Sequence, residues 1–141
     1  MKRRDDVLAY LSKVPLFSAC TKKDVQHIAK YSEHVVIPAG TKMTEEGKVG
    51  YEFYVILDGK ASVSKGGREV NTIGAGDAFG ELALLDRAPR NATVAAVTDV
   101  EVLVMGQREF TAALDVVPTL AHKLLVGLAR RIHQVDAQAV N

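Results

Sequence analysis

A glycine-rich segment of this chain combines a carboxylate and an arginine in a pattern suited to a phosphorylated ligand. Its sequence is Phe79-Gly80-Glu81-Leu82-Ala83 and, after a short spacer, Arg90-Asn91-Ala92-Thr93. Glycine lets a backbone approach a ligand closely, and free N–H groups at the start of a helix after Gly80 would attract an anion. The guanidinium of Arg90 can clamp a phosphate with two parallel hydrogen bonds, which lysine does less well.

Glu81 is unusual beside an anion site, because two negative charges repel each other. Its carboxylate contributes to binding if it accepts a hydrogen bond from a hydroxyl group on another part of the ligand. A phosphorylated sugar offers a phosphate to Arg90 and a hydroxyl to Glu81. The alternative interpretation is an ordinary turn followed by a surface salt bridge, an interaction that adds little stability.

The elements around this segment are predicted from the spacing of apolar and turn residues. Residues 3–32 have helical spacing with one interruption, and Thr21 with Asp24 forms the expected cap of a second helix. Residues 34–105 alternate short apolar stretches with turn residues, which is typical of an antiparallel sandwich or barrel. Helical spacing returns after residue 106. We therefore expect an α+β fold, an antiparallel, jelly-roll-like β-roll with N-terminal helices, a short helix in the phosphate-binding loop and a C-terminal helix.

The length and composition fit one compact domain. The chain has 141 residues, of which 48% are hydrophobic and 25% are charged, and this composition is too apolar for a disordered chain. We expect a single domain over residues 1–141, divided into N-terminal helices at 1–32, a β-roll at 33–105 that contains the phosphate-binding segment 79–94, and C-terminal helices at 106–138.

Several classes of function are disfavoured by what the sequence lacks. The net charge is only +1, which gives no electrostatic support for a nucleic-acid partner. The apolar runs are far shorter than the roughly 20 residues of a membrane-spanning helix, and there is no signal-peptide pattern, so we expect a cytoplasmic location. The single cysteine, Cys20, and the scattered histidines have neither metal-ligand nor nucleophile spacing. We expect no metal, no cofactor and no enzymatic activity.

The segment 79–94 resembles the phosphate-binding cassette of the cyclic nucleotide-binding domain family. That family includes regulatory subunits of cAMP-dependent protein kinase, catabolite activator-type regulators and gated channels. Its pattern opens with Gly-Glu-Leu-Ala and, after a variable spacer, has an arginine and a small residue before a strand. Four further motifs are similar to the family's and follow its order: Val14-Pro15-Leu16-Phe17-Ser18, Pro38-Ala39-Gly40, Phe53-Tyr54-Val55-Ile56-Leu57-Asp58-Gly59 and Leu128-Ala129-Arg130-Arg131-Ile132.

The resemblance implies a role for each residue of the cassette. Arg90 would pair with the exocyclic phosphate oxygens, and Glu81 would accept a hydrogen bond from the ribose 2′-hydroxyl. The backbone amides of Ala83 and Asn91 would reach the phosphate, Gly80 would permit the close approach, and Thr93 would point toward the purine. The implied ligand-binding set is Phe79, Gly80, Glu81, Leu82, Ala83, Arg90, Asn91, Ala92 and Thr93.

Asn91 departs from the family's commonest pattern and leaves the choice of nucleotide open. The cAMP-binding kinase domains usually have alanine there and catabolite activators have serine, whereas cGMP-selective domains often have threonine. An asparagine amide can both donate and accept hydrogen bonds, so it suits either a phosphate oxygen or the exocyclic amine of guanine. We expect cAMP as the ligand, with cGMP as the alternative.

The last helix has two alternative roles, because its apolar residues repeat at spacings of four and three. This stripe can pack on the chain's own domain or pair with a second chain as a homodimer; it comprises Ala121, Leu125, Leu128, Ile132 and Val135. In the family this helix is a lid over the base, which implies that Arg131 reaches toward Glu81 and that Val135 covers the purine.

The sequence therefore predicts a cyclic nucleotide sensor that relays occupancy through its C-terminal helix to a partner protein or a missing effector domain. The alternative from another class is a degenerate interaction module that keeps this fold and binds no nucleotide.

Overall fold

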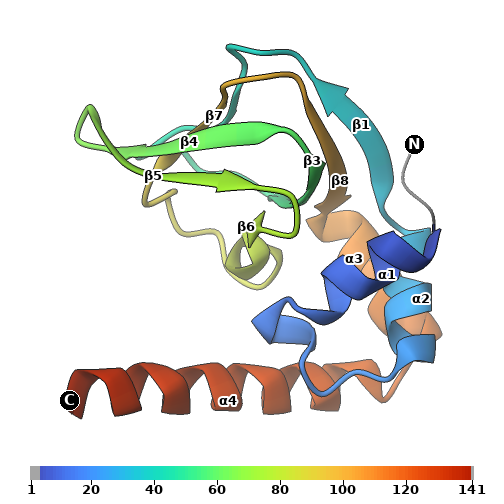
Figure 1. Ribbon diagram of the computed structural model, residues 1–141. Coiled ribbons are helices and arrows are strands. Elements are labelled where there is room, and N and C mark those ends of the chain that lie inside the picture. The colour runs from blue at the N-terminus through green and yellow to red at the C-terminus, as the bar shows by residue number, and fades with distance from the viewer. Residues whose placement is uncertain (1–3, 141) are drawn as a thin grey trace. The chain divides into compact units, whose positions relative to one another are not determined.

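Figure 1 shows the computed structural model of the chain, which describes the backbone of residues 4–140 and the side chains of residues 7–134. The chain forms two units. One combines Met1–Tyr31 with Phe110–Asn141 and is helical, and the other is Ser32–Glu109 and contains the strands.

The strand-containing unit is built from two antiparallel sheets of four strands each. In the described residues the strand order is β1-β8-β3-β6 in the first sheet and β2-β7-β4-β5 in the second. The bounds are β1 Glu33–Ile37, β2 Lys42–Thr44, β3 Glu52–Asp58, β4 Lys60–Lys65, β5 Arg68–Gly74, β6 Ala78–Phe79, β7 Thr93–Ala96 and β8 Val100–Gly106. The prediction of an antiparallel β-roll within an α+β fold is confirmed.

The core of this roll is made by the strand residues whose side chains point inward. On β7 the pattern alternates, with Val94 and Ala96 buried and Thr93 and Ala95 half-buried, as the period of two in a strand requires. The buried cluster joins both sheets and comprises Tyr54, Ile56, Ala61, Val94, Ala96, Val100 and Val102. It gives the cassette, which connects β6 to β7, a rigid support at both ends.

The helical unit begins with the predicted pair of helices. They are α1 (Arg4–Ser12) and α2 (Lys22–Lys30), separated by the 3-10 turn η1 (Pro15–Phe17). The Thr21 hydroxyl accepts a hydrogen bond from the Asp24 amide at 3.1 Å, and the Asp24 carboxylate accepts one from the Thr21 amide at 2.9 Å. This capping box confirms the predicted start of α2.

The C-terminal helices are α3 (Gln107–Val116), which starts in the strand unit, and α4 (Leu120–Val140). Two polar contacts join α4 to the N-terminal part of the helical unit, one to α2 and one to the segment between α1 and α2. The Lys123 ammonium lies 2.6 Å from the Asp24 carboxylate, and the Arg130 guanidinium donates to the Ser18 carbonyl at 3.3 Å. Between these two points, Gly127 lies against the backbone of η1.

The face of α4 that packs differs from the predicted stripe. Leu120, Leu124 and Gly127 are buried, whereas Leu125 is 65% exposed and Ile132 is 59% exposed. Within the helical unit, the interpretation of the stripe as a packing face is therefore wrong for Ala121, Leu125 and Ile132. The apolar spacing does not predict this face because one of its buried positions is a glycine.

Cys20 is half-buried near the start of α2. Burial, together with the nearby Asp24 carboxylate, raises the pKa of its thiol to about 11. The thiol is therefore protonated at neutral pH, as expected for a small apolar residue rather than a reactive thiolate.

In the part of the chain that the structure describes, no single helix has the length and apolarity to cross a membrane. The bent pair Gln107–Val116 and Leu120–Gln134 passes that test on length and composition alone.

Candidate functional site

The cassette starts where β6 ends at Phe79 and the backbone turns at Gly80. Gly80 has φ +83°, a left-handed conformation that side chains disfavour. A Cβ at this position would lie 2.6 Å from Nη1 of Arg90 and 2.8 Å from the Glu52 carbonyl oxygen. Glycine is therefore required here both by backbone conformation and by space, and Gly80 lies directly against the Arg90 guanidinium.

The helix after Gly80 is shorter and tighter than expected. It is the 3-10 helix η2, which covers only Glu81–Leu84, and the Ala83 amide donates to the Gly80 carbonyl at 3.0 Å. The Ala83 amide therefore already has a partner, which differs from the expected row of free N–H groups. A single 3-10 turn also sums few peptide dipoles, so the expected helix-dipole contribution to anion binding is small.

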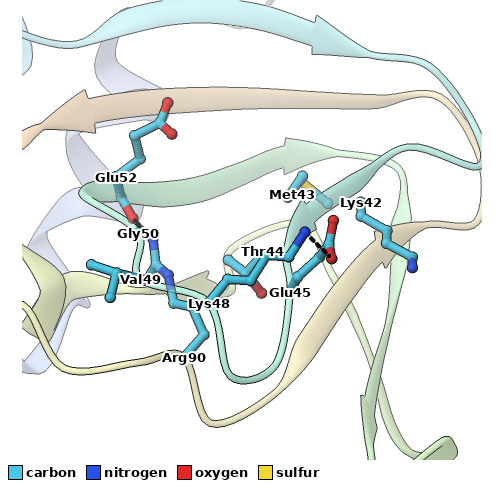
Figure 2. Close-up of a pocket in the computed structure, with 9 residues that line it drawn as sticks. All are labelled: Lys42, Met43, Thr44, Glu45, Lys48, Val49, Gly50, Glu52 and Arg90. Carbon is cyan, nitrogen blue, oxygen red and sulfur yellow. Dashed lines mark hydrogen bonds and ion pairs between the residues drawn. The ribbon is translucent and has the colours of Figure 1, made fainter.

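Arg90 is held by the loop between β2 and β3, residues 45–51, and by the first residue of β3 (Figure 2). Its amide donates to the Lys48 carbonyl at 2.9 Å, and its carbonyl accepts from the Gly47 amide at 2.9 Å. One terminal guanidinium nitrogen, Nη2, donates to the Glu52 carbonyl at 2.6 Å. The Nε atom is buried and has no hydrogen-bond partner among the described residues.

Glu81 begins η2 next to Gly80 and is only 9% exposed. Burial of a carboxylate is costly unless hydrogen bonds or charges compensate it, so this is a specific position rather than a solvated turn. The structure thus brings together three of the predicted site residues, Gly80, Glu81 and Arg90, around one backbone turn.

Phe79 precedes this turn and has a clear packing role. Its ring stacks on that of Tyr54, with centroids 4.9 Å apart and an interplanar angle of 14°, because the two residues are register partners on β6 and β3. Burial raises the pKa of Tyr54 to about 12, and its hydroxyl donates to the Met43 carbonyl at 3.2 Å. The stack anchors the start of the cassette to the core of the roll.

The other predicted residues of the cassette differ from one another in exposure and in contacts. Leu82 is 40% exposed, Ala83 is buried and Asn91 is exposed. The Ala92 carbonyl accepts a hydrogen bond from the Thr44 hydroxyl at 3.0 Å. This contact positions the chain between Arg90 and β7.

Thr93 contacts the β2–β3 loop. It neighbours Val94, whose side chain points into the core, so the alternation of β7 directs Thr93 to the opposite face. Its hydroxyl accepts a hydrogen bond from the Glu46 amide at 3.0 Å. The predicted approach of Thr93 to the purine stays a prediction.

The two predicted lid residues lie in α4, in the helical unit. Arg131 is partly buried there, and its predicted approach to Glu81 stays a prediction. The side chain of Val135 lies outside the described residues.

A cleft of about 180 Å³ opens beside Arg90, and Figure 2 shows the residues that line it. Arg90 is the one member of the predicted ligand set among them; the lining comprises Lys42, Met43, Thr44, Glu45, Lys48, Val49, Gly50, Glu52 and Arg90. The contribution of this loop to the surroundings of Arg90 is not apparent from the sequence. The only sequence signal is a second glycine-containing turn, at Gly47 and Gly50, before an apolar strand.

Within the described residues, no three histidine, cysteine, aspartate or glutamate side chains are placed to hold a metal ion.

Curated relatives of this chain are cAMP-related regulators. The chain is 31% identical over 129 residues to the cyclic AMP receptor protein of Thermus thermophilus, covering 88% of this chain and 60% of that protein. It is 40% identical over 105 residues to a cAMP-dependent protein kinase regulatory subunit of Schizosaccharomyces pombe, covering 74% of this chain and 26% of that one. The chain therefore spans less than two thirds of these relatives.

Solved structures have the same fold. The N-terminal domain of a transcriptional regulator from Streptomyces coelicolor superposes with a TM-score of 0.82 at 28% identity, covering 92% of this chain and 94% of that one. The regulatory domain of Toxoplasma gondii PKA, solved with cAMP, gives 0.70 at 33% identity, covering 80% of this chain and 46% of that one.

The family model of the cyclic nucleotide-binding domain matches residues 34–116. This range contains all of the β-roll except Glu33, the first residue of β1, together with the cassette and α3. Together with the relatives and the shared fold, it shows that the chain belongs to the cyclic nucleotide-binding domain family.

Proposed function

We propose that this chain binds cAMP at the cassette and that Arg90 binds the phosphate. The observation that supports this most directly is the buried Nε of Arg90, which has no partner among the described residues, while Nη2 is fixed by the Glu52 carbonyl. A buried donor without a partner is unfavourable. Once the side chain turns toward a bound phosphate, a phosphate oxygen would satisfy this donor with a charge-assisted hydrogen bond.

In this proposal Glu81 accepts a hydrogen bond from the ribose 2′-hydroxyl, because its buried carboxylate adjoins the Gly80 turn where the guanidinium lies. The Asn91 amide is a further donor for the phosphate. The choice of cAMP is supported by the relatives, since the Toxoplasma gondii domain was solved with cAMP and the Thermus thermophilus protein is a cyclic AMP receptor.

We also propose that nucleotide occupancy is relayed through α4 to a partner protein or to a further domain. The exposed side chains of Leu125 and Ile132 offer an apolar face for this contact, with the heptad spacing that a second copy of α4 would match. The same face supports the second candidate function, an interaction module that binds no nucleotide. The location of the protein in the cytoplasm stays a prediction.

Calorimetric titration with cAMP, cGMP and AMP separates these two functions. One bidentate phosphate pair, further amide hydrogen bonds and a buried purine together exceed the ~8 kcal/mol that micromolar affinity represents. We therefore expect cAMP to bind with a micromolar or lower dissociation constant. No heat and no thermal stabilisation at millimolar cAMP would contradict the proposal and favour the interaction module.

Replacing Asn91 with alanine tests the choice of base. We expect cAMP and cGMP to lose affinity equally, by about the ~1 kcal/mol of one net hydrogen bond, because the exposed side chain serves the phosphate. Paired titrations of the variant measure this. A loss confined to cGMP would show that the side chain contacts the guanine amine, and would shift the proposed ligand to cGMP.

A further inference from the structure

The β2–β3 loop holds the backbone of Arg90 by hydrogen bonds, and the Arg90 side chain packs against the same loop. Both backbone hydrogen bonds of Arg90, to Lys48 and Gly47, come from this loop, and a bridge between Val49 and Pro89 extends the pairing. The backbone of Arg90 is therefore fixed independently of its side chain. These backbone hydrogen bonds do not by themselves determine the position of the guanidinium.

Gly50 is the loop residue against which the guanidinium packs. A Cβ at position 50 would have three nearest neighbours, all of them guanidinium atoms of Arg90: Nε as the closest, Nη2 at 2.6 Å and Cζ at 2.9 Å. Carbon atoms do not approach nitrogen or carbon this closely, so a methyl group here would displace the guanidinium. Figure 2 shows Gly50 and Arg90 side by side in the cleft.

The glycine at position 50 is not explained by backbone conformation. Gly40, Gly47, Gly59, Gly66, Gly67, Gly76 and Gly80 have positive φ, and Gly50 does not belong to this set. Alanine can therefore adopt the backbone conformation of residue 50 without strain. The three heavy atoms nearest to a Cβ at this position all belong to the Arg90 guanidinium, so the absence of a side chain leaves room for that group.

We propose that Gly50 is a positioning residue for phosphate recognition. Its lack of a side chain leaves the space in which the guanidinium lies against the loop, with Nη2 on the Glu52 carbonyl. The proposal rests on the proposed function, because it takes Arg90 as the residue that binds the phosphate. Gly50 itself acts only through Arg90.

The substitution Gly50→Ala should change binding far more than folding. The atoms that the new methyl group meets belong to the end of a flexible side chain, which can rotate away, so the fold survives. The displaced guanidinium loses its bond to Glu52 and its alignment with the phosphate. We expect cAMP affinity to fall roughly tenfold, comparable to the loss of one charge-assisted hydrogen bond.

Gly106→Ala is the matched control, since Gly106 also lacks a positive φ. A Cβ there meets only the carboxylate end of the flexible Glu109 side chain. We expect Gly106→Ala to bind cAMP like the parent. Adenosine, which has no phosphate, should bind equally to the parent and to Gly50→Ala, whereas a purely structural effect of Gly50→Ala would weaken adenosine too.

A double variant checks that Gly50 acts through Arg90. In an Arg90→Ala background, Gly50→Ala should cause no further loss of cAMP affinity, because the displaced group is absent. Additive losses would overturn the positioning role. Equal cAMP affinity of Gly50→Ala and Gly106→Ala would overturn it as well.

A measurement without nucleotide separates this inference from the proposed function. The Nε–H group of Arg90 is buried, so its hydrogen exchange, followed by NMR, should be slow in the parent and faster in Gly50→Ala. An unchanged exchange rate overturns the positioning role, whatever the binding result. A parent protein that shows slow exchange and yet binds no cAMP overturns the proposed function instead.

Discussion

Replacing Arg90 with alanine is expected to weaken cAMP binding by about two powers of ten or more. Truncation of one partner of a buried, hydrogen-bonded charge pair typically costs about 2 to 5 kcal/mol of binding free energy, largely because the other charge stays buried without a partner. This corresponds to a loss of affinity of about 30-fold or more. Arg90→Lys keeps the positive charge but loses the planar fork, and should cost about one to two powers of ten. Calorimetric titration of the three proteins should give cAMP affinities that decrease in the order parent, Arg90→Lys, Arg90→Ala.

The matched control is Arg87→Ala, in the same connection between η2 and β7. The Arg87 guanidinium lies over the ring of Tyr51, 5.6 Å from its centroid, and Arg87 is exposed. An exposed contact of this kind contributes little, so Arg87→Ala should bind cAMP like the parent. If both Arg90 variants also bound like the parent, the phosphate would have to lie elsewhere and the assignment of the cassette would be wrong.

The fold was predictable from the sequence because its signals are local and repeated. Apolar stretches interrupted by glycine turns indicate antiparallel strands between residues 34 and 105, and the Thr21–Asp24 pair indicates the start of α2. Such patterns depend on residues two to four positions apart, for which the backbone geometry is fixed in advance. Gly80 directly before Glu81 is likewise a local signal, and it indicates the turn at the start of the cassette.

The parts that were missed depend on contacts between distant segments. Gly50 and Glu52 enter the site only because the β2–β3 loop folds onto Arg90, about forty positions later in the chain. Periodicity gives the existence of a strand more reliably than it gives the face to which each side chain points.

The packed face of α4 was missed for a related reason. The spacing of apolar residues predicts that Leu125 and Ile132 are packed. The buried face is instead formed by Leu120, Leu124 and a glycine. Gly127 has no apolar side chain, yet it permits a close approach of α4 to η1. A Cβ at this position would meet the Leu16 carbonyl oxygen first, then the Leu16 carbonyl carbon at 3.1 Å and the Pro15 carbonyl oxygen at 3.2 Å.

Gly127→Ala is therefore expected to destabilise the protein, although alanine is the better helix former. Helix propensity alone would favour alanine by about 1 kcal/mol. The opposing contact is with the backbone of η1, which cannot rotate away as a side chain does, and overpacking of this kind costs about 1 to 3 kcal/mol or more. We expect a net loss of about 1 to 2 kcal/mol in the free energy of unfolding, because α4 must also move away from its contacts with η1.

Thermal unfolding of Gly127→Ala beside His122→Ala measures this balance. His122 is exposed on the same helix, so alanine there brings its helix propensity without a clash. The melting temperature should rise slightly for His122→Ala and fall by about 5 °C or more for Gly127→Ala. A rise for both variants would mean that propensity outweighs the contact and that α4 does not lie this close to η1. The fall would instead identify Gly127 as the position that fixes α4, the helix of the proposed relay, to the N-terminal helices.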